Sequence, residues 1–140
     1  MKSLILLLLL IEACSSKHRH SVLYGNWAVL SVTLNGVEIS GIEHGAPVWA
    51  SQSMIIDRQL GVIQLPIQDS SALLGRYRIE NILNEEALVI YGSNDERFND
   101  TLFIKTLEEH RPGPGVVEYW LQLCSDKLCI YAKKSVLWSD

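Results

Sequence analysis

The chain has 140 residues, of which 48% are hydrophobic and 20% are charged, and its formal net charge is −4. This composition is typical of one folded domain, and the length leaves no room for a two-domain enzyme with a cofactor cleft between lobes. The slightly acidic balance provides no basic surface for phosphates, so the sequence argues against nucleic-acid binding.

Residues 1–13 are predicted to be an export signal. Lys2 supplies a positive charge, and Leu4 to Ile11 form an unbroken apolar run. A helix of that length rises only about 12 Å, which is too short for roughly 30 Å of bilayer hydrocarbon. The run therefore fits the apolar region of a secretory signal. Cleavage after Ala13 would place the bulky Ile11 where an ordinary signal peptidase requires a small residue.

The residues Ile11-Glu12-Ala13-Cys14 resemble the lipobox of bacterial lipoprotein signals. The resemblance implies cleavage before Cys14 and acylation of its sulfur. Two or three acyl chains anchor a protein essentially permanently, so the bilayer is an expected partner. The alternative is a plain secreted protein with an unmodified cysteine.

Residues 14–21 are then a lipid-anchored polar tether. It contains His18 and His20, which we interpret as solvated side chains facing the lipid headgroups. Two histidines in a tail lack the further ligands that a metal site needs, so no metal is predicted there.

The remaining residues, 22–140, show period-two patterning almost throughout and hardly any helical stripe. The Asn35-Gly36 pair is a strong hairpin signal after the first strand. Ser71 to Leu74 could form one helical turn at most, and Arg111 to Gly115 is predicted to be a loop because of its Pro and Gly content. The predicted strands are 27–34, 37–40, 48–57, 62–65, 75–82, 87–91, 101–107, 116–124 and 128–134.

The pattern predicts an all-β fold, an antiparallel meander of eight or nine strands. No long crossover helix exists to support parallel pairing. Closure into a barrel would remove the exposed edge strands of such a sheet, and we favour it over a sandwich.

Once Cys14 is assigned to the anchor, Cys124 and Cys129 remain as an even pair in an oxidising compartment. A hairpin that turns at Asp126-Lys127 places the two cysteines directly opposite each other. The sequence therefore predicts a structural disulfide. A redox-active pair is the alternative, although reactive dithiols normally have C-x-x-C spacing.

The run Gly25-Asn26-Trp27 is similar to the opening of bacterial lipocalin-like lipoproteins. The stretches 75–79 and 128–134 are similar to the middle and final strands of that family. The resemblance implies an eight-stranded barrel that holds one small apolar ligand. It also implies that Trp27 closes one end of the barrel, with Lys133 or Lys134 of the last strand stacked on its ring.

Strand alternation nominates a set of inward-facing residues that would line a ligand cavity. An eight-stranded barrel is just wide enough either to be filled by side chains or to hold one small molecule, and the sequence leaves that choice open. The candidate ligand-binding residues are Met54, Ile56, Tyr77, Ile79, Leu102, Ile104 and Leu121, with Leu123 and Ile130 on the same face.

The sequence carries no enzyme motif: it has no nucleophile elbow, no H-E-x-x-H and no phosphate-binding glycine loop. The adjacent acids Glu85-Glu86 and Glu108-Glu109 are interpreted as solvated turn residues, because neighbours on a strand point to opposite faces. We predict a protein without catalytic residues, metal or cofactor.

Two functions follow as hypotheses. The first is a lipoprotein of the bacterial cell envelope, anchored in the outer membrane and facing the periplasm, whose barrel binds a small apolar ligand. The alternative is a non-enzymatic module with a solid barrel that docks a protein or a glycan of the envelope. Aromatic residues are enriched at interfaces, so its expected exposed anchors are Trp49, Trp120, Tyr131 and Trp138.

Overall fold

The computed structural model describes residues 21–39, 53–65 and 73–137. The predicted signal, Cys14 and nearly all of the predicted tether lie outside the described residues, as do Trp49 and Trp138. The predictions for those positions therefore rest on the sequence alone.

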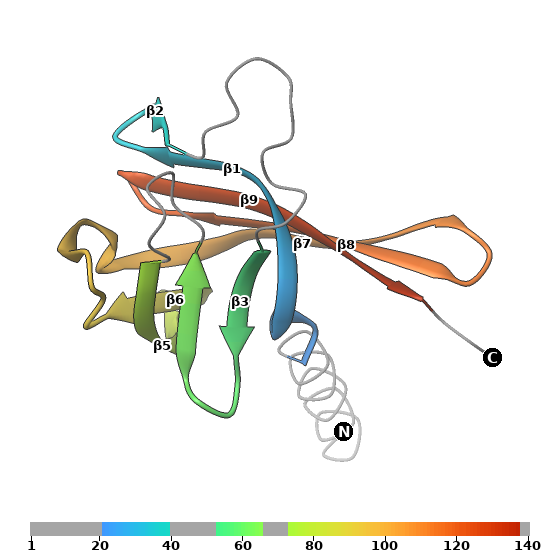
Figure 1. The fold of residues 1–140 in the computed structure, drawn as a ribbon, viewed down its shortest axis with the longest axis horizontal. Helices are drawn as coiled ribbons and strands as arrows, with labels where there is room; N and C mark the ends of the chain where they lie inside the picture. Colours follow the sequence, from blue (N-terminus) through green and yellow to red (C-terminus); the bar gives the residue numbers. More distant parts are fainter. Residues whose placement is uncertain (1–20, 40–52, 66–72, 138–140) are drawn as a thin grey trace, which may run out of the picture.

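The described residues form an antiparallel meander in which consecutive strands pair with one another (Figure 1). The first strand, β1, also pairs with the last, β9, from Leu34↔Leu128 to Ala28↔Lys133. This pairing closes β1 and β3 to β9 into an eight-stranded ring, and β2 adds one short strand beside β1. The predicted all-β closed barrel is confirmed. The strands are β1 (Gly25–Leu34), β2 (Val37–Glu38), β3 (Ser53–Asp57), β4 (Val62–Leu65), β5 (Leu73–Ile82), β6 (Glu85–Tyr91), β7 (Asp100–Gly113), β8 (Val116–Cys124) and β9 (Leu128–Leu137).

The antiparallel registers define the two ends of the barrel. Gly25 pairs with Ile56, so β1 begins where β3 ends. The β3–β4 turn and the β5–β6 turn lie at this same end, which we call the N-terminal end. The turn at Asn35-Gly36 and the segment between β6 and β7 lie at the opposite end, because each successive strand reverses direction.

Alternate residues of the strands point inward and form one continuous apolar core. Removing such side chains from water is the main favourable term in folding and is worth roughly 1.5–3 kcal/mol for each large side chain. The buried members of the core are Leu23, Trp27, Val29, Val32, Leu34, Met54, Ile56, Ile63, Leu65, Leu73, Tyr77, Leu88, Ile90, Phe98, Leu102, Leu121, Leu123, Leu128, Ile130 and Ala132.

Strands β7, β8 and β9 continue beyond the barrel as a three-stranded extension, which we call the wing (Figure 1). It comprises residues 108–113 of β7, 116–120 of β8 and 133–137 of β9. The β6–β7 pairing ends at Ala87↔Phe103 and the β1–β9 pairing at Ala28↔Lys133. Both outer edges of the wing are therefore unpaired by other described strands.

The wing corrects the prediction that Arg111 to Gly115 is a loop, because β7 runs to Gly113 and only the turn before Val116 interrupts the sheet. Pro112 is tolerated there because it lies on an unpaired edge, next to an irregularity in the register between His110 and Gly113. Glu108 and Glu109 are consequently strand residues instead of turn residues.

Three smaller differences separate the predicted elements from the observed ones. Leu73 and Leu74 belong to β5 and form no helical turn, because they pair with β4. The β5–β6 turn is Leu83-Asn84, and β6 already begins at Glu85. The predicted polar loop 93–99 contains a short 3-10 helix, η1 (Glu96–Phe98).

Candidate functional site

The predicted cavity-lining residues all belong to the apolar core or pack against it. Met54, Ile56, Tyr77, Leu102 and Leu121 are buried members of the core, as are Leu123 and Ile130. Ile79 and Ile104 are only partly buried and pack against the same cluster. The structure therefore brings the whole predicted set to one interior.

Trp27 lies fully buried where β1 begins. Its indole Nε1 donates a hydrogen bond to the carbonyl oxygen of Leu23 at 2.8 Å. The Nζ atom of Lys134 lies 4.5 Å from the centroid of the Trp27 ring and donates to the carbonyl oxygens of Tyr24, at 2.8 Å, and Val22. A cation over an indole face is attracted by the ring quadrupole, so these contacts hold the N-terminal end together.

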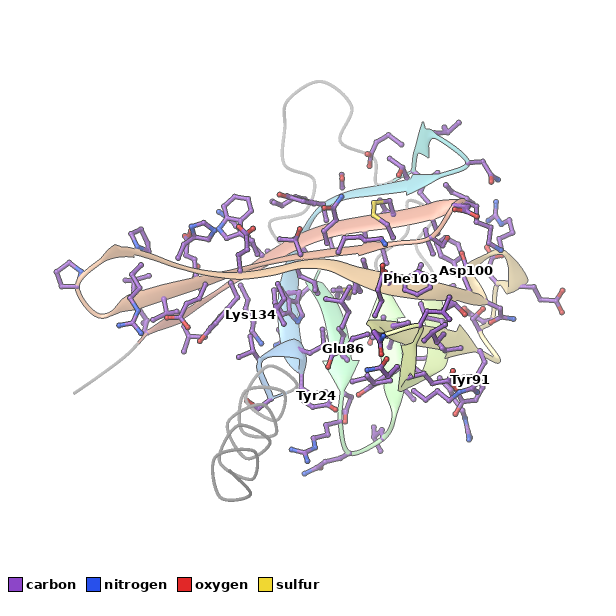
Figure 2. All side chains as sticks on the ribbon, turned by 180° about the vertical axis from the view of Figure 1, so that it is seen from behind. Tyr24, Glu86, Tyr91, Asp100, Phe103 and Lys134 are labelled. Atoms are coloured by element: carbon purple, nitrogen blue, oxygen red, sulfur yellow. A yellow bond between two sulfur atoms is a disulfide. The ribbon has the colours of Figure 1, made fainter. Side chains whose placement is uncertain are left out.

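The sequence offers Lys133 and Lys134 as the residue that stacks on Trp27. In the structure these neighbours point to opposite faces of β9, so only one of them can reach the ring. Lys134 faces Trp27, whereas Lys133 lies on the outer surface, 5.6 Å from the ring centroid of Trp120. Burial lowers the pKa of Lys134 to about 8, because desolvation disfavours its charged form. Figure 2 shows Lys134 and Tyr24 on the same side of the molecule.

A second set of contacts reinforces the N-terminal end. The hydroxyl of Tyr77 donates to the carbonyl oxygen of Asp57 at 3.0 Å, and burial raises the pKa of Tyr77 to about 12. The guanidinium of Arg58 lies 5.3 Å from the centroid of the Tyr24 ring. The first residues of β1, the β3–β4 turn and β5 are thereby tied to one another.

The opposite end of the barrel receives Phe98, a buried core side chain from η1. This role could not be predicted from local patterning, because Phe98 is the single large apolar residue in the polar segment 93–99. Packing is also tight at Gly75, where an added Cβ would lie 3.0 Å from Ile90 Cγ2 and 3.2 Å from Ser93 Cβ. Among the described residues, side chains are therefore buried at both ends of the barrel, with Trp27 at one and Phe98 at the other.

Cys124 and Cys129 form a disulfide in the structure, and their Cα atoms are 4.1 Å apart. They pair directly across the β8–β9 hairpin, in which Ser125 N donates to Leu128 O at 2.7 Å. The predicted pairing is confirmed. The disulfide lies on the outside of the barrel, because the alternate residues Leu123 and Ile130 are buried inside.

The outward side chains of β7, β8 and β9 form a continuous surface that we call the outer face. Its rows follow from the strand registers, and each row crosses the three strands from β9 to β7. The rows are Cys129–Cys124–Phe103, Tyr131–Gln122–Thr106, Lys133–Trp120–Glu108 and Ser135–Glu118–His110.

Three rings run diagonally across this outer face. The centroids of His110 and Trp120 are 6.1 Å apart, and those of Trp120 and Tyr131 are 6.2 Å apart, both pairs with edge-to-face geometry. Such pairs are favourable by roughly 0.5–1.5 kcal/mol beyond the burial of their surfaces. The three rings are therefore held in place by one another. Lys133 beside Trp120 and Glu108, 3.2 Å from the His110 ring, add both signs of charge.

The outer face ends in a hollow of about 500 Å³ beside the disulfide. Asp100 and Phe103, labelled in Figure 2, both contribute to it. The hydroxyl of Ser125 donates to the Asp100 carboxylate, and Lys105 lies 5.0 Å from the ring centroid of Phe103. The residues that line the hollow are Asp100, Thr101, Phe103, Lys105, Cys124, Ser125, Asp126 and Lys127.

Strand alternation in the sequence predicts that Trp120 and Tyr131 face outward, but it did not predict that His110, Phe103 and the hollow join them. His110 was missed because β7 was expected to end at residue 107. Phe103 could have been found by alternation, because it follows the inward Leu102.

Among the described residues, no group of three or more His, Cys, Asp or Glu side chains could hold a metal ion. The part of the chain that the structure describes also contains no helix long and apolar enough to cross a bilayer. Comparison with protein-family models, with curated proteins and with solved structures finds no match. The resemblance to lipocalin-like lipoproteins therefore remains a prediction from the sequence.

Proposed function

We propose that this protein is a lipid-anchored, non-enzymatic interaction module of the bacterial cell envelope. In this proposal the barrel is a scaffold, and its outer face binds a protein partner. The observation that carries the proposal is the set of three rings, His110, Trp120 and Tyr131. They contact one another on the outer face, while the apolar side chains of the same strands point into the core. The anchor is the acylated Cys14 of the predicted lipobox.

The chemistry of the outer face fits a protein partner. Trp, Tyr and Arg dominate binding energy at interfaces because they bury a large area with few rotatable bonds. Here Trp120 and Tyr131 are partly buried and held by neighbouring rings, so ordering them on binding costs little. Lys133, Glu108 and Glu118 surround the rings with charges of both signs, which would provide a polar rim.

A photocrosslinking experiment tests the proposal. A benzophenone amino acid replaces Gln122, which lies between Thr106 and Tyr131 on the outer face, and in a control chain it replaces the exposed Tyr91 of β6. We expect irradiated cells to give one discrete protein adduct at position 122 and none at position 91. The adduct should disappear in a Trp120→Ala/Tyr131→Ala background and persist in an Asn26→Ala background.

An adduct that survives removal of both rings would contradict the proposal, as would the same adducts at both positions. If no protein adduct forms but the purified protein is retained on an envelope polysaccharide through Trp120, the partner is a glycan and the protein-binding proposal is wrong.

The second candidate function is sequestration of a small apolar ligand inside the barrel. The observation that favours it is the closed eight-stranded ring with an apolar lining. Native mass spectrometry of the purified protein, with titration of an apolar fluorescent probe, separates the two candidates. Saturable binding that Ile79→Trp abolishes would support the ligand hypothesis, because the larger side chain occupies the interior. Absence of saturable binding favours the solid scaffold.

A further inference from the structure

Two large apolar side chains are exposed in turns at the N-terminal end of the barrel. Leu60 in the β3–β4 turn is 73% exposed, and Leu83 in the β5–β6 turn is 93% exposed. Single exposed leucines are ordinary on protein surfaces. These two come from separate turns, and both turns lie at the end of the barrel where β1 begins.

The backbone at Leu83 makes this placement more informative. Leu83 and Asn84 have φ angles of 51° and 66°, which is the left-handed geometry of a tight hairpin turn. Gly and Asn are the usual residues there, because a side chain with a Cβ is disfavoured in that conformation. An exposed leucine at this position adds neither core burial nor a favourable turn conformation to the fold.

The chain that precedes the domain enters at the same end. Val22 and Tyr24 receive the hydrogen bonds from Lys134, next to Trp27 at the start of β1. From Cys14 to Ser21 the chain advances 21 − 14 = 7 residues, which span at most about 25 Å when fully extended. An acyl group on Cys14 would therefore hold this end, and not the opposite one, beside the membrane.

We propose that the N-terminal end of the barrel rests on a lipid bilayer, with Leu60 and Leu83 inserted into its interfacial region. This inference rests on the proposed anchor at Cys14 and adds a defined orientation to it. Figure 1 shows the β3–β4 turn and the first residues of β1 at the bottom of the view, on the side that would face the bilayer.

The basic side chains near this end are paired with acidic ones. We therefore expect apolar insertion into the bilayer, and not attraction to anionic lipids, to hold this end at the membrane. Lys105 pairs with Glu85 at 3.1 Å, and Arg78 pairs with Glu80. These pairs leave little net positive charge to attract anionic headgroups. Arg58 and Tyr24 are suited to the interface, where aromatic rings and long basic side chains place their polar ends at headgroup level.

The test uses the full chain, purified from membranes with its anchor and reconstituted into phosphatidylcholine vesicles. A ketone-bearing amino acid carries a nitroxide at position 60 or 83, and at position 37 or 74 in control chains. Val37 and Leu74 are matched controls, because they are 63% and 50% exposed in strands that place them toward the opposite end. The readout is the accessibility of the nitroxide to oxygen relative to a water-soluble nickel chelate.

We expect this ratio to be at least threefold higher at positions 60 and 83 than at 37 and 74, and unchanged when anionic lipid is added. Leu60→Glu should lower the ratio at position 83 to the control value, and Leu83→Glu should do the same at position 60, whereas Val37→Glu/Leu74→Glu should change neither. Equal ratios at the two ends in a chain that sediments with the vesicles would overturn the orientation and leave the anchor intact. A chain that carries no acyl group would overturn both.

Discussion

The barrel and the wing are built from the same three strands, yet only the barrel has a core. Within the barrel, the inward residues of β8 and β9, such as Leu123 and Ile130, are covered by the strands opposite them. Where the wing leaves the barrel, the equivalent positions carry Glu109, Tyr119 and Lys134, of which Tyr119 and Lys134 are only partly covered by the start of β1 and the edge of the core. A strand face therefore becomes part of the core only where other strands enclose it, and alternation of polar and apolar residues alone does not achieve this.

The barrel and the wing also differ in what their tryptophans contribute. The barrel buries Trp27 among its stabilising contacts, whereas the wing carries Trp120 on its outer face. Substitutions on a surface that contributes little to folding do not endanger the fold, so we expect the two regions to respond very differently to substitution.

The largest expected effect is that of Trp27→Ala. Truncating a fully buried tryptophan should lower the free energy of unfolding by about 3–5 kcal/mol. Trp120→Ala on the outer face should cost about 1 kcal/mol or less, because it removes only edge contacts. Urea denaturation of both variants measures the difference, and equal losses would contradict the division between scaffold and surface.

The disulfide is expected to have the next largest effect. Cys124 and Cys129 are five residues apart, and a loop this short gains only about 2 kcal/mol in the chain-entropy account. Cys124→Ser/Cys129→Ser should lower the unfolding free energy by that amount and leave the circular dichroism spectrum of the barrel unchanged. A variant that no longer folds would contradict this estimate, because the disulfide would then stabilise the fold by more than its short loop allows.

The stability of the N-terminal end should depend on pH. The pKa of Lys134 is about 8 in the fold, against 10.5 for the free side chain, so the unfolded chain binds more protons between these values. Stability should therefore rise as the pH increases from about 8 toward 10.5, by roughly 1 kcal/mol after allowance for solvent screening. Lys134→Met should abolish this rise in denaturation curves recorded from pH 7.5 to 10.

Tyr77 limits the rise at still higher pH. Its pKa is raised from 10.0 to about 12 in the fold, so the unfolded chain loses its proton first and stability falls above pH 10. Tyr77→Phe should delay this fall. If the stability of the wild-type chain instead decreased steadily from pH 8, the conclusion that burial lowers the pKa of Lys134 would be contradicted.

The smallest effect is expected at the exposed turns. Leu83→Gly should raise the unfolding free energy by about 0.5–1 kcal/mol, because Gly adopts a positive φ without strain. Leu60→Gly is the matched control and should lower it slightly, because Leu60 is not among the described residues with a positive φ. Thermal unfolding measures the change in stability of each variant. If Leu60→Gly were also stabilising, the gain from Leu83→Gly could not be attributed to its positive φ.

Local patterns in the sequence predicted most of the fold. Period-two alternation located the strands, Asn35-Gly36 located the first hairpin, and the spacing of Cys124 and Cys129 gave the disulfide. The errors occurred where pairing overrides local preference. Pro112 was expected to break the strand, but it is tolerated because the β7 edge is free there.

The candidate site was harder to predict than the fold, because its geometry depends on residues far apart in the chain. Alternation identified Trp120 and Tyr131 as outward, but the third ring required β7 to extend to His110. The choice between Lys133 and Lys134 could not be made from spacing either, because adjacent strand residues face opposite sides and only the register fixes which side is inside.

The sequence by itself therefore determined the strand type, the order of the hairpins and the cysteine pairing, because these depend on residues near each other along the chain. The tertiary structure decided the pairing of β1 with β9, the insertion of Phe98 and the assembly of the outer face. These features depend on contacts between residues distant in sequence, and such contacts form only when the whole sheet closes and covers one of its faces.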